Sequence, residues 1–159
     1  MEIDKIPNLS DEMYIDMLDQ AKKSIRHRHS YVLHKPGAEF NKVFNLMQHN
    51  SYMQPHLHPG KEKIEKIYII RGSVCCFFFD DYGEVTHKID LKTNGKKFIS
   101  VPAFKWHTYA ITSEIAVTYE TMMGKYHPST WKTFAEWAPK EQSDESKSFL
   151  KKLHKIAIN

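Results

Sequence analysis

Two histidines separated by a single residue, His56 and His58, constrain this chain more than any other feature of its sequence. In an extended strand, residues i and i+2 point to the same face, so the two imidazoles would project side by side. Seven residues after His58, Glu65 stands at the head of an apolar run, 67–70, which leads to Gly72. The β-branched and aromatic residues of that run are typical of a buried strand. A strand that begins at Glu65 could bring a carboxylate to the two imidazoles, and this pattern predicts a metal site.

A third histidine, His107, follows a turn that starts at Pro102 and is itself the first residue of another predicted strand. Three imidazoles and one carboxylate suit one divalent transition ion, and they do not distinguish Fe, Mn, Ni, Zn and Cu. A rival carboxylate, Glu62, lies in the loop between His58 and Glu65. We favour Glu65, because a ligand on a strand is held more rigidly than one on a charged loop.

The spacing of these residues resembles the two sequence motifs of the cupin barrel. The first motif, His-x-His followed by Glu and then Gly, fits His56, His58, Glu65 and Gly72, and the second, Pro-x-Gly-x-x-His, fits 102–107. The gap between the second histidine and the glutamate is longer than in most cupins, and Phe104 stands where most carry glycine. The longer gap is similar to that of the WbuC family of cupin-fold metalloproteins. Further similar segments cover nearly the whole chain: 26–28, 33–34, 72–83, 124–130, 134–135 and 137–139.

The resemblance implies a mainly β fold, namely a cupin-type antiparallel β-barrel, or jelly roll, with an N-terminal helix and a short C-terminal helix. Independently, several short strands separated by turns are typical of an antiparallel barrel or sandwich. A length of 159 residues fits a single domain, 1–159. We expect the helix at about 10–27, the barrel at about 38–123, and a C-terminal wrap and helix at about 124–157. The expected strands are 42–48 (where a short helix is the alternative), 51–58, 65–70, 73–79, 84–91, 97–101, 107–111 and 115–122.

The alternation of side chains along a strand predicts further residues of the pocket. If 51–58 is one strand, Tyr52 and Gln54 share the inward face with the two histidines, and Tyr109 shares it with His107. Tyr109 and Gln54 are therefore candidate catalytic residues, and Tyr52 and Lys105, which precedes Trp106 and His107, are candidate ligand contacts. For an inward tyrosine, core packing is the more common role.

Arg26 and Arg28 admit two interpretations. They could form the basic end of the N-terminal helix, where cations interact favourably with the helix dipole. Alternatively, they could contact an anionic ligand near the mouth of the barrel, and the resemblance favours this second role as substrate-binding residues.

The composition of the chain limits the classes of partner that it is expected to bind. A net charge of +4 comes from 23 basic and 19 acidic residues that are dispersed along the chain. The sequence therefore contains no cluster of basic residues of the kind that binds nucleic acid. No apolar run approaches the length of about 20 residues that a membrane span requires. The two cysteines, Cys75 and Cys76, are adjacent and are expected to be free thiols. The first residues lack the layout of a secretory signal, which makes the cytoplasm the expected location.

The resemblance also implies a biological setting. The WbuC family is associated with bacterial surface-polysaccharide genes, so the expected partner is a small molecule, a sugar or nucleotide-sugar derivative. Three functions stay open at this point: a metal-dependent isomerase or epimerase, a metal-dependent oxygenase, and a non-catalytic sugar-binding accessory protein. A homodimer also stays open.

Overall fold

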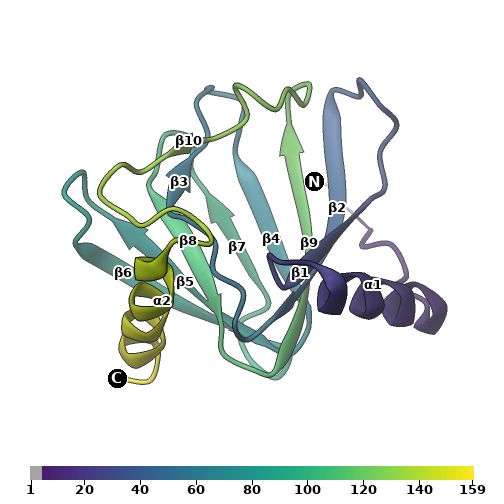
Figure 1. Ribbon diagram of the computed structural model, residues 1–159. Helices are drawn as coiled ribbons and strands as arrows, with labels where there is room; N and C mark the ends of the chain where they lie inside the picture. The colour runs from purple at the N-terminus through teal and green to yellow at the C-terminus, as the bar shows by residue number, and fades with distance from the viewer. Residues whose placement is uncertain (1–4) are drawn as a thin grey trace.

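The computed structural model describes residues 5–159, which form two facing five-stranded antiparallel sheets with a helix packed outside each sheet (Figure 1). In the first sheet the strand order is β1 (Arg28–Val32), β2 (Phe40–Gln48), β9 (Ile115–Met123), β4 (Glu65–Arg71) and β7 (Phe98–Val101). In the second sheet it is β10 (Thr133–Phe134), β3 (His56–Leu57), β8 (His107–Ile111), β5 (Ser73–Phe79) and β6 (Val85–Lys92). This confirms the predicted mainly β, cupin-type barrel.

Strand β5 shows how the sequence specifies the layers. Its residues are apolar without alternation, because both of its faces are covered. Val74, Cys76 and Phe78 face the opposite sheet, whereas Cys75, Phe77 and Phe79 pack beneath helix α2 (Asp144–Ala157) together with Leu150 and Leu153. The two cysteines are free and buried, as predicted.

Helix α1 (Asp11–Lys23) covers the outer face of the first sheet. Ser10 caps the helix, because its hydroxyl accepts a hydrogen bond of 3.1 Å from the backbone N–H of Met13. Met17 and Ala21 are fully buried against that sheet. The amphipathic helix predicted from the spacing of its apolar residues is therefore confirmed, and it places the chain at the start of β1.

The expected end of this helix, at about residue 27, is wrong. The helix ends at Lys23, His27 adopts a positive φ of 56°, and Arg28 begins strand β1 opposite Met47 of β2. Arg26 and Arg28 therefore do not form a basic helix terminus, because the helix has already ended and the backbone from Arg28 onward pairs with β2.

The expected strand at 51–58 is also wrong for most of its length, since only His56–Leu57 form strand β3. Segment 51–55 connects β2 of the first sheet to β3 of the second and pairs with no strand. Other groups bind its backbone instead: the Arg28 guanidinium donates to the carbonyl of Tyr52, and the N–H of Ala135 donates to the carbonyl of Pro55. For 42–48 the strand interpretation is confirmed, with β2 starting two residues earlier.

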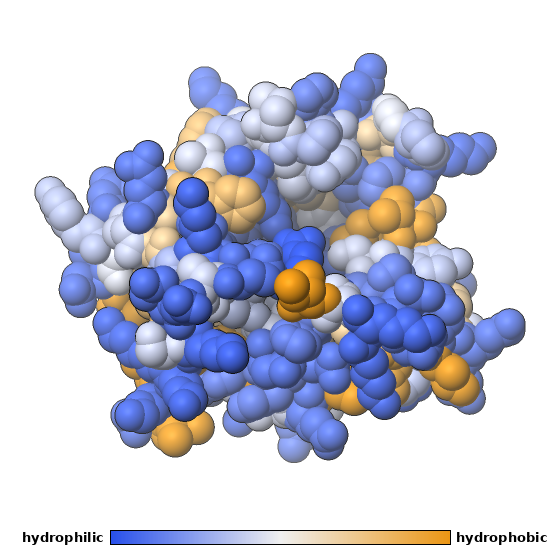
Figure 2. All heavy atoms as spheres, viewed as in Figure 1, coloured by the Kyte–Doolittle hydropathy of each residue, from blue (hydrophilic) through white to orange (hydrophobic). Residues whose placement is uncertain are grey.

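Among residues 5–159, no helix is long and apolar enough to cross a membrane. Figure 2 shows hydrophilic residues over most of one face, with hydrophobic residues in scattered groups. The domain limits stay a prediction, although residues beyond 124 contact the barrel through β10 and α2.

Candidate metal centre

The structure brings the four predicted ligands together at one end of the barrel interior. His56 lies on β3 directly opposite His107 of β8, His58 follows β3, and Glu65 is the first residue of β4. All four side chains are buried, and each offers one ligand atom within 4.8 Å of the others. The rival Glu62 is exposed in the preceding loop, so the geometry favours Glu65 as the carboxylate of the cluster.

The backbone fixes the proton on each imidazole. Nδ1 of His56 lies 2.9 Å from the carbonyl oxygen of Gln54, Nδ1 of His58 lies 2.8 Å from that of Trp131, and Nδ1 of His107 lies 2.8 Å from that of Lys105. A carbonyl oxygen only accepts hydrogen bonds, so each Nδ1 must carry the proton. In neutral imidazoles this leaves the three Nε2 lone pairs to face the centre, which is how protein ligands to transition metals are oriented.

Glu65 tests whether a cation fits this centre. Its Oε2 lies 2.9 Å from Nε2 of His58 and 3.0 Å from Nε2 of His107. With both Nδ1 atoms protonated, these contacts join lone pairs unless a proton or a metal ion lies between them. Burial alone would raise the pKa of Glu65, but when a proton lies in these contacts the hydrogen bonds and charge from His107 and His58 outweigh burial and hold the pKa well below its ordinary value. Burial, followed by the charge of Lys132, holds the pKa of His56 well below its ordinary value. The donor set therefore fits a divalent transition ion.

Two backbone features of the motifs position these ligands. Gly72, which ends the β4 strand, has a φ of 73°, and a Cβ there would overlap the carbonyl oxygen of Ile115. Phe104, in place of the usual glycine, also has a positive φ, of 61°, and its N–H donates to the carbonyl of His58. The turn before His107 is thus tied to the second histidine through the main chain, while the Phe104 side chain stays 56% exposed.

A second buried carboxyl, Glu120 of β9, lies beside the cluster and was missed in the sequence. Its Oε2 accepts hydrogen bonds from the hydroxyls of Tyr109 (3.1 Å) and Thr118 (2.7 Å) and from the amide of Asn45. Burial, the nearby Glu65 carboxylate and a hydrogen bond with it raise the pKa of Glu120 to about 8. A glutamate in the middle of an otherwise apolar strand was the signal that could have revealed it.

These groups open onto a cavity of about 520 Å³, a size that suits a small molecule. Tyr109 lines the cavity, as predicted from its parity with His107. Gln54 does not line it: its amide donates 3.1 Å to the carbonyl of Ala135. Tyr52 also lies outside, with its hydroxyl 2.6 Å from the carbonyl of Pro139, and Lys105 contributes its backbone carbonyl to His107. The failed strand at 51–58 explains why alternation misplaced Tyr52 and Gln54.

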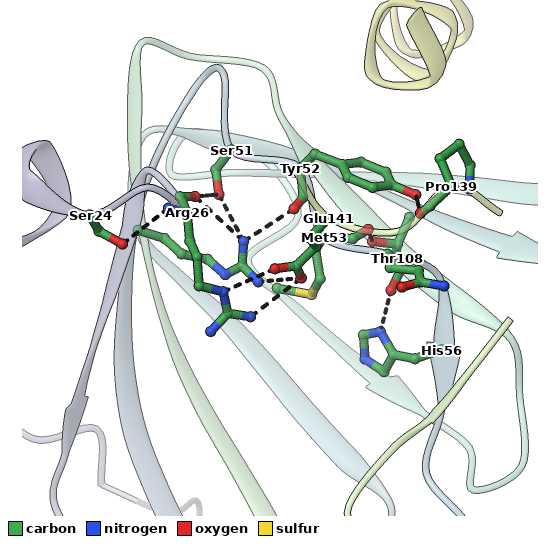
Figure 3. Close-up of polar contacts among 11 residues, drawn as sticks. Ser24, Arg26, Ser51, Tyr52, Met53, His56, Thr108, Pro139 and Glu141 are labelled. Atoms are coloured by element: carbon green, nitrogen blue, oxygen red, sulfur yellow. Dashed lines mark hydrogen bonds and ion pairs between the residues drawn. The ribbon is translucent and has the colours of Figure 1, made fainter. Parts of the chain in front are cut away.

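Arg26 and Arg28 do line the cavity, but Glu141 from the C-terminal segment binds both of them. Oε1 of Glu141 lies 2.6 Å from Nη2 of Arg28, and Oε2 lies 3.0 Å from Nε of Arg26. Figure 3 shows Glu141 and the Arg26 guanidinium pointing toward each other. Burial lowers the pKa of Arg28, an effect that the charge of Glu141 opposes. The two arginines are therefore near the cavity, as the resemblance implied, and are already engaged by a carboxylate.

The C-terminal segment supplies another part of the wall. The ring centres of Trp131 and His58 are 6.1 Å apart, and the ammonium of Lys63 lies 5.1 Å from the ring centre of Trp131. Phe134 pairs with His56 across the β10–β3 ladder. Tyr126 and Phe134 stay 57% and 46% exposed, so they form part of the cavity rim instead of a buried wrap.

Comparison with solved structures supports this fold. Protein SO0799 from Shewanella oneidensis has a TM-score of 0.60 at 11% identity, over 92% of this chain and 98% of that one. CapF, in a complex with the inhibitor 3-isopropenyl-tropolone, has a TM-score of 0.57 at 17% identity, over 67% of this chain and 31% of CapF. At these identities the similarity shows the fold alone.

No curated protein sequence matches the chain. One family model, described as "Domain of unknown function (DUF6016)", matches residues 9–91, slightly more than half of the 159 residues. The matched region contains His56, His58 and Glu65 and ends before His107. On this match, the chain belongs to the DUF6016 family.

Proposed function

We propose that this chain is a metal-binding cupin that holds one divalent transition ion with His56, His58, Glu65 and His107 and binds an oxygen-rich small molecule beside it. One observation carries the proposal: three backbone carbonyls hold the Nδ1 protons, so that three Nε2 atoms and a carboxylate oxygen converge in a buried space. A structural zinc site is less favoured, because closed structural sites are usually rich in cysteine and both cysteines lie elsewhere.

The proposed ligand is a sugar or nucleotide-sugar derivative, and the proposed reaction is an isomerisation or epimerisation. The resemblance to the WbuC family and its polysaccharide setting suggests this substrate class. The polar cavity wall supports it, since Ser30, Asn41 and Asn45 line the cavity and offer hydrogen-bonding groups to hydroxyls. The two free, buried thiols suit a reducing compartment, and the cytoplasm remains the proposed location.

Each residue near the centre has a distinct part in this proposal. A bound divalent ion would polarise a carbonyl or hydroxyl oxygen of the ligand as a Lewis acid. With a pKa of about 8, the Glu120 carboxyl is mostly protonated near neutral pH, so it would give its proton to the ligand and then take one back, and Tyr109 and Thr118 fix its orientation within the cavity. The aromatic rings of Trp131 and Phe134 exclude water from one side of the cavity.

Elemental analysis of the purified protein tests the metal site. We expect about one transition ion per chain in the wild type and a large loss in His107→Ala, because three of four ligands bind far more weakly than four. His49→Ala is the matched control, since His49 is exposed and lies in the turn after β2. Glu65→Gln should lose metal while Glu62→Gln retains it. Full occupancy in His107→Ala, or loss in Glu62→Gln alone, would contradict the assignment.

Incubation of the metal-loaded protein with a nucleotide-sugar panel tests the reaction. An isomer formed without oxygen supports the proposed chemistry, and the Glu120→Gln variant should then lose turnover while keeping its metal. Product that forms only with oxygen would favour an oxygenase, and binding without product would favour an accessory protein.

A further inference from the structure

Lys132 occupies a defined place beside the histidines. In the β10–β3 ladder, Phe134 lies opposite His56 and Thr133 lies opposite Leu57. The same register, continued by one residue, places Lys132 opposite His58, and residues opposite each other in an antiparallel pair point to the same face. Lys132 and Phe134 accordingly line the cavity with the two histidines, whereas Thr133 is exposed.

The Lys132 ammonium is not engaged by the protein. Within residues 5–159 its Nζ makes no hydrogen bond and no ion pair, unlike the guanidinium groups of Arg26 and Arg28, which Glu141 binds. Burial lowers the pKa of Lys132, the charge of Glu65 opposes this effect, and the charge of Arg28 adds to it. Lys132 is half-buried, so its ammonium loses part of its hydration without gaining a close partner, and an anionic ligand would offset that loss.

The balance of charge in the cavity points the same way. Once a divalent cation engages Glu65, the remaining charges are Lys132, the Arg26–Arg28–Glu141 group, which contains two cations and one anion, and at most one negative charge on Glu120. The cavity would then carry a net positive charge, which favours a negatively charged ligand.

Asn41 supplies an independent polar group on the facing sheet. It is 6% exposed, and its amide nitrogen donates to the carbonyl oxygens of Met122 and Gly124. Two carbonyl partners fix the orientation of this amide, because only the nitrogen can donate. Its Oδ1 is buried without a partner among the described residues, and Asn41 lines the cavity. An unpaired buried acceptor calls for a donor, such as a ligand hydroxyl.

We infer that Lys132 and Asn41 select a hydroxylated anion: Lys132 Nζ binds a carboxylate or phosphate group, and Asn41 Oδ1 accepts a hydrogen bond from a hydroxyl of the same molecule. The inference rests on the proposed function, because it places this ligand in the cavity next to the metal centre. It assigns the anion contact to Lys132, immediately before β10, and leaves the two arginines to hold the C-terminal segment.

Calorimetric titration of the metal-loaded protein with three probes tests the selection. D-glucuronate carries hydroxyls and a carboxylate, D-glucose 6-phosphate carries hydroxyls and a phosphate, and D-glucose carries hydroxyls alone. We expect the wild type to prefer at least one anionic probe over glucose by about tenfold or more, the usual effect of a hydrogen bond to a charged group. Lys132→Met should abolish that preference and Lys132→Arg should keep it. Lys151→Met, the same change at an exposed position of α2, is the matched control.

Lysine labelling with acetic anhydride gives a second measurement that needs no variant. A bound anion should protect Lys132 from acetylation and leave Lys151 unaffected, as read by mass spectrometry of the two peptides. An anion preference that survives in Lys132→Met, an absence of preference in the wild type, or a lack of protection at Lys132 would overturn the inference. Metal content, measured on the same samples, tests the proposed function separately: a full metal site with no anion preference refutes only the inference.

Discussion

Replacement of Glu141 by alanine should destabilise the protein strongly, although Glu141 belongs to the loop just before the C-terminal helix. Its carboxylate joins Arg28, at the start of β1, and Arg26 to the segment before α2. The side chains of Arg28 and Glu141 are 8% and 15% exposed, so this ion pair is largely withdrawn from water. Without Glu141, the Arg28 charge would stay buried and lose its only ion-pair partner among the described residues.

The magnitude follows from the two arms of the contact. Removing one partner of a buried ion pair costs about 3 to 5 kcal/mol. The low end applies to Arg28, because it keeps hydrogen bonds of 3.3 Å to Ser51 and 3.1 Å to the carbonyl of Tyr52. The Arg26 arm adds less than about 1 kcal/mol, since that side chain is 49% exposed. We therefore expect a loss of about 3 kcal/mol, or a decrease in Tm of about 6 to 12 °C for a chain of this size.

Urea unfolding of the wild type, Glu141→Ala and Glu136→Ala measures this cost. Glu136 is exposed on the same segment, so its replacement should change stability by less than about 0.5 kcal/mol. Burial raises the pKa of Glu141, but its hydrogen bond with Arg26 and the charge of Arg28 outweigh it and lower the pKa below 4.5. The stabilisation is thus present above pH 4.5 and lost as pH falls through the lower, folded-state pKa. A Glu141→Ala protein as stable as Glu136→Ala at pH 7 would refute the reasoning.

Two further predictions concern the motif glycine and a histidine pair. Gly72→Ala should lower the free energy of unfolding by about 2 kcal/mol or more, because the positive φ and the overlap with the Ile115 carbonyl both oppose a Cβ. Gly95→Ala is the control and should be tolerated, because the atom nearest to its added Cβ would lie 3.7 Å away. His154 stacks on His49 at 4.1 Å between ring centres, and burial, followed by the charge of His49, lowers its pKa from 6.5. The unfolded chain then binds this proton more readily than the folded protein. As the pH is lowered from 7.5 to 5.5, the urea midpoint of the wild type should therefore decrease more steeply than that of His154→Gln. Equal slopes would show that His154 does not contribute.

The four clustered residues were predictable because each depends on short-range rules. His56 and His58 are two residues apart at and just after β3, and strand β4, which is followed by Gly72, begins at Glu65. The turn before His107 follows from its proline start. In each case the local sequence specifies an element whose end carries the ligand, and the barrel brings these ends together.

The failures share one cause, namely contacts between residues distant in sequence. Alternation placed Tyr52 inward, but segment 51–55 forms no ladder because Arg28 and the 135–139 segment hold its backbone and side chains. The positions of Arg28 and Glu141 depend on each other across 113 residues, and nothing local to either one reports the pairing. Lys132 stands among the aromatic residues Trp131 and Phe134, which predict packing against the barrel and not a cavity, and only the pairing of β10 with β3 turns it inward.

The C-terminal segment completes the candidate site instead of merely covering it. The carbonyl of Trp131 holds the Nδ1 proton of His58, and the N–H of Ala135 fixes Pro55 immediately before His56. Because a metal ligand needs its proton on the far nitrogen, a change at Trp131 that moves its carbonyl would alter the lone pair that His58 presents to the centre. The same segment places Lys132 over the cavity and extends through Glu141 to the arginines of the N-terminal segment. The orientation of the proposed metal ligands and the proposed selection of an anionic ligand therefore both depend on one stretch of chain, residues 126–141, which lies wholly outside the region that the family model matches.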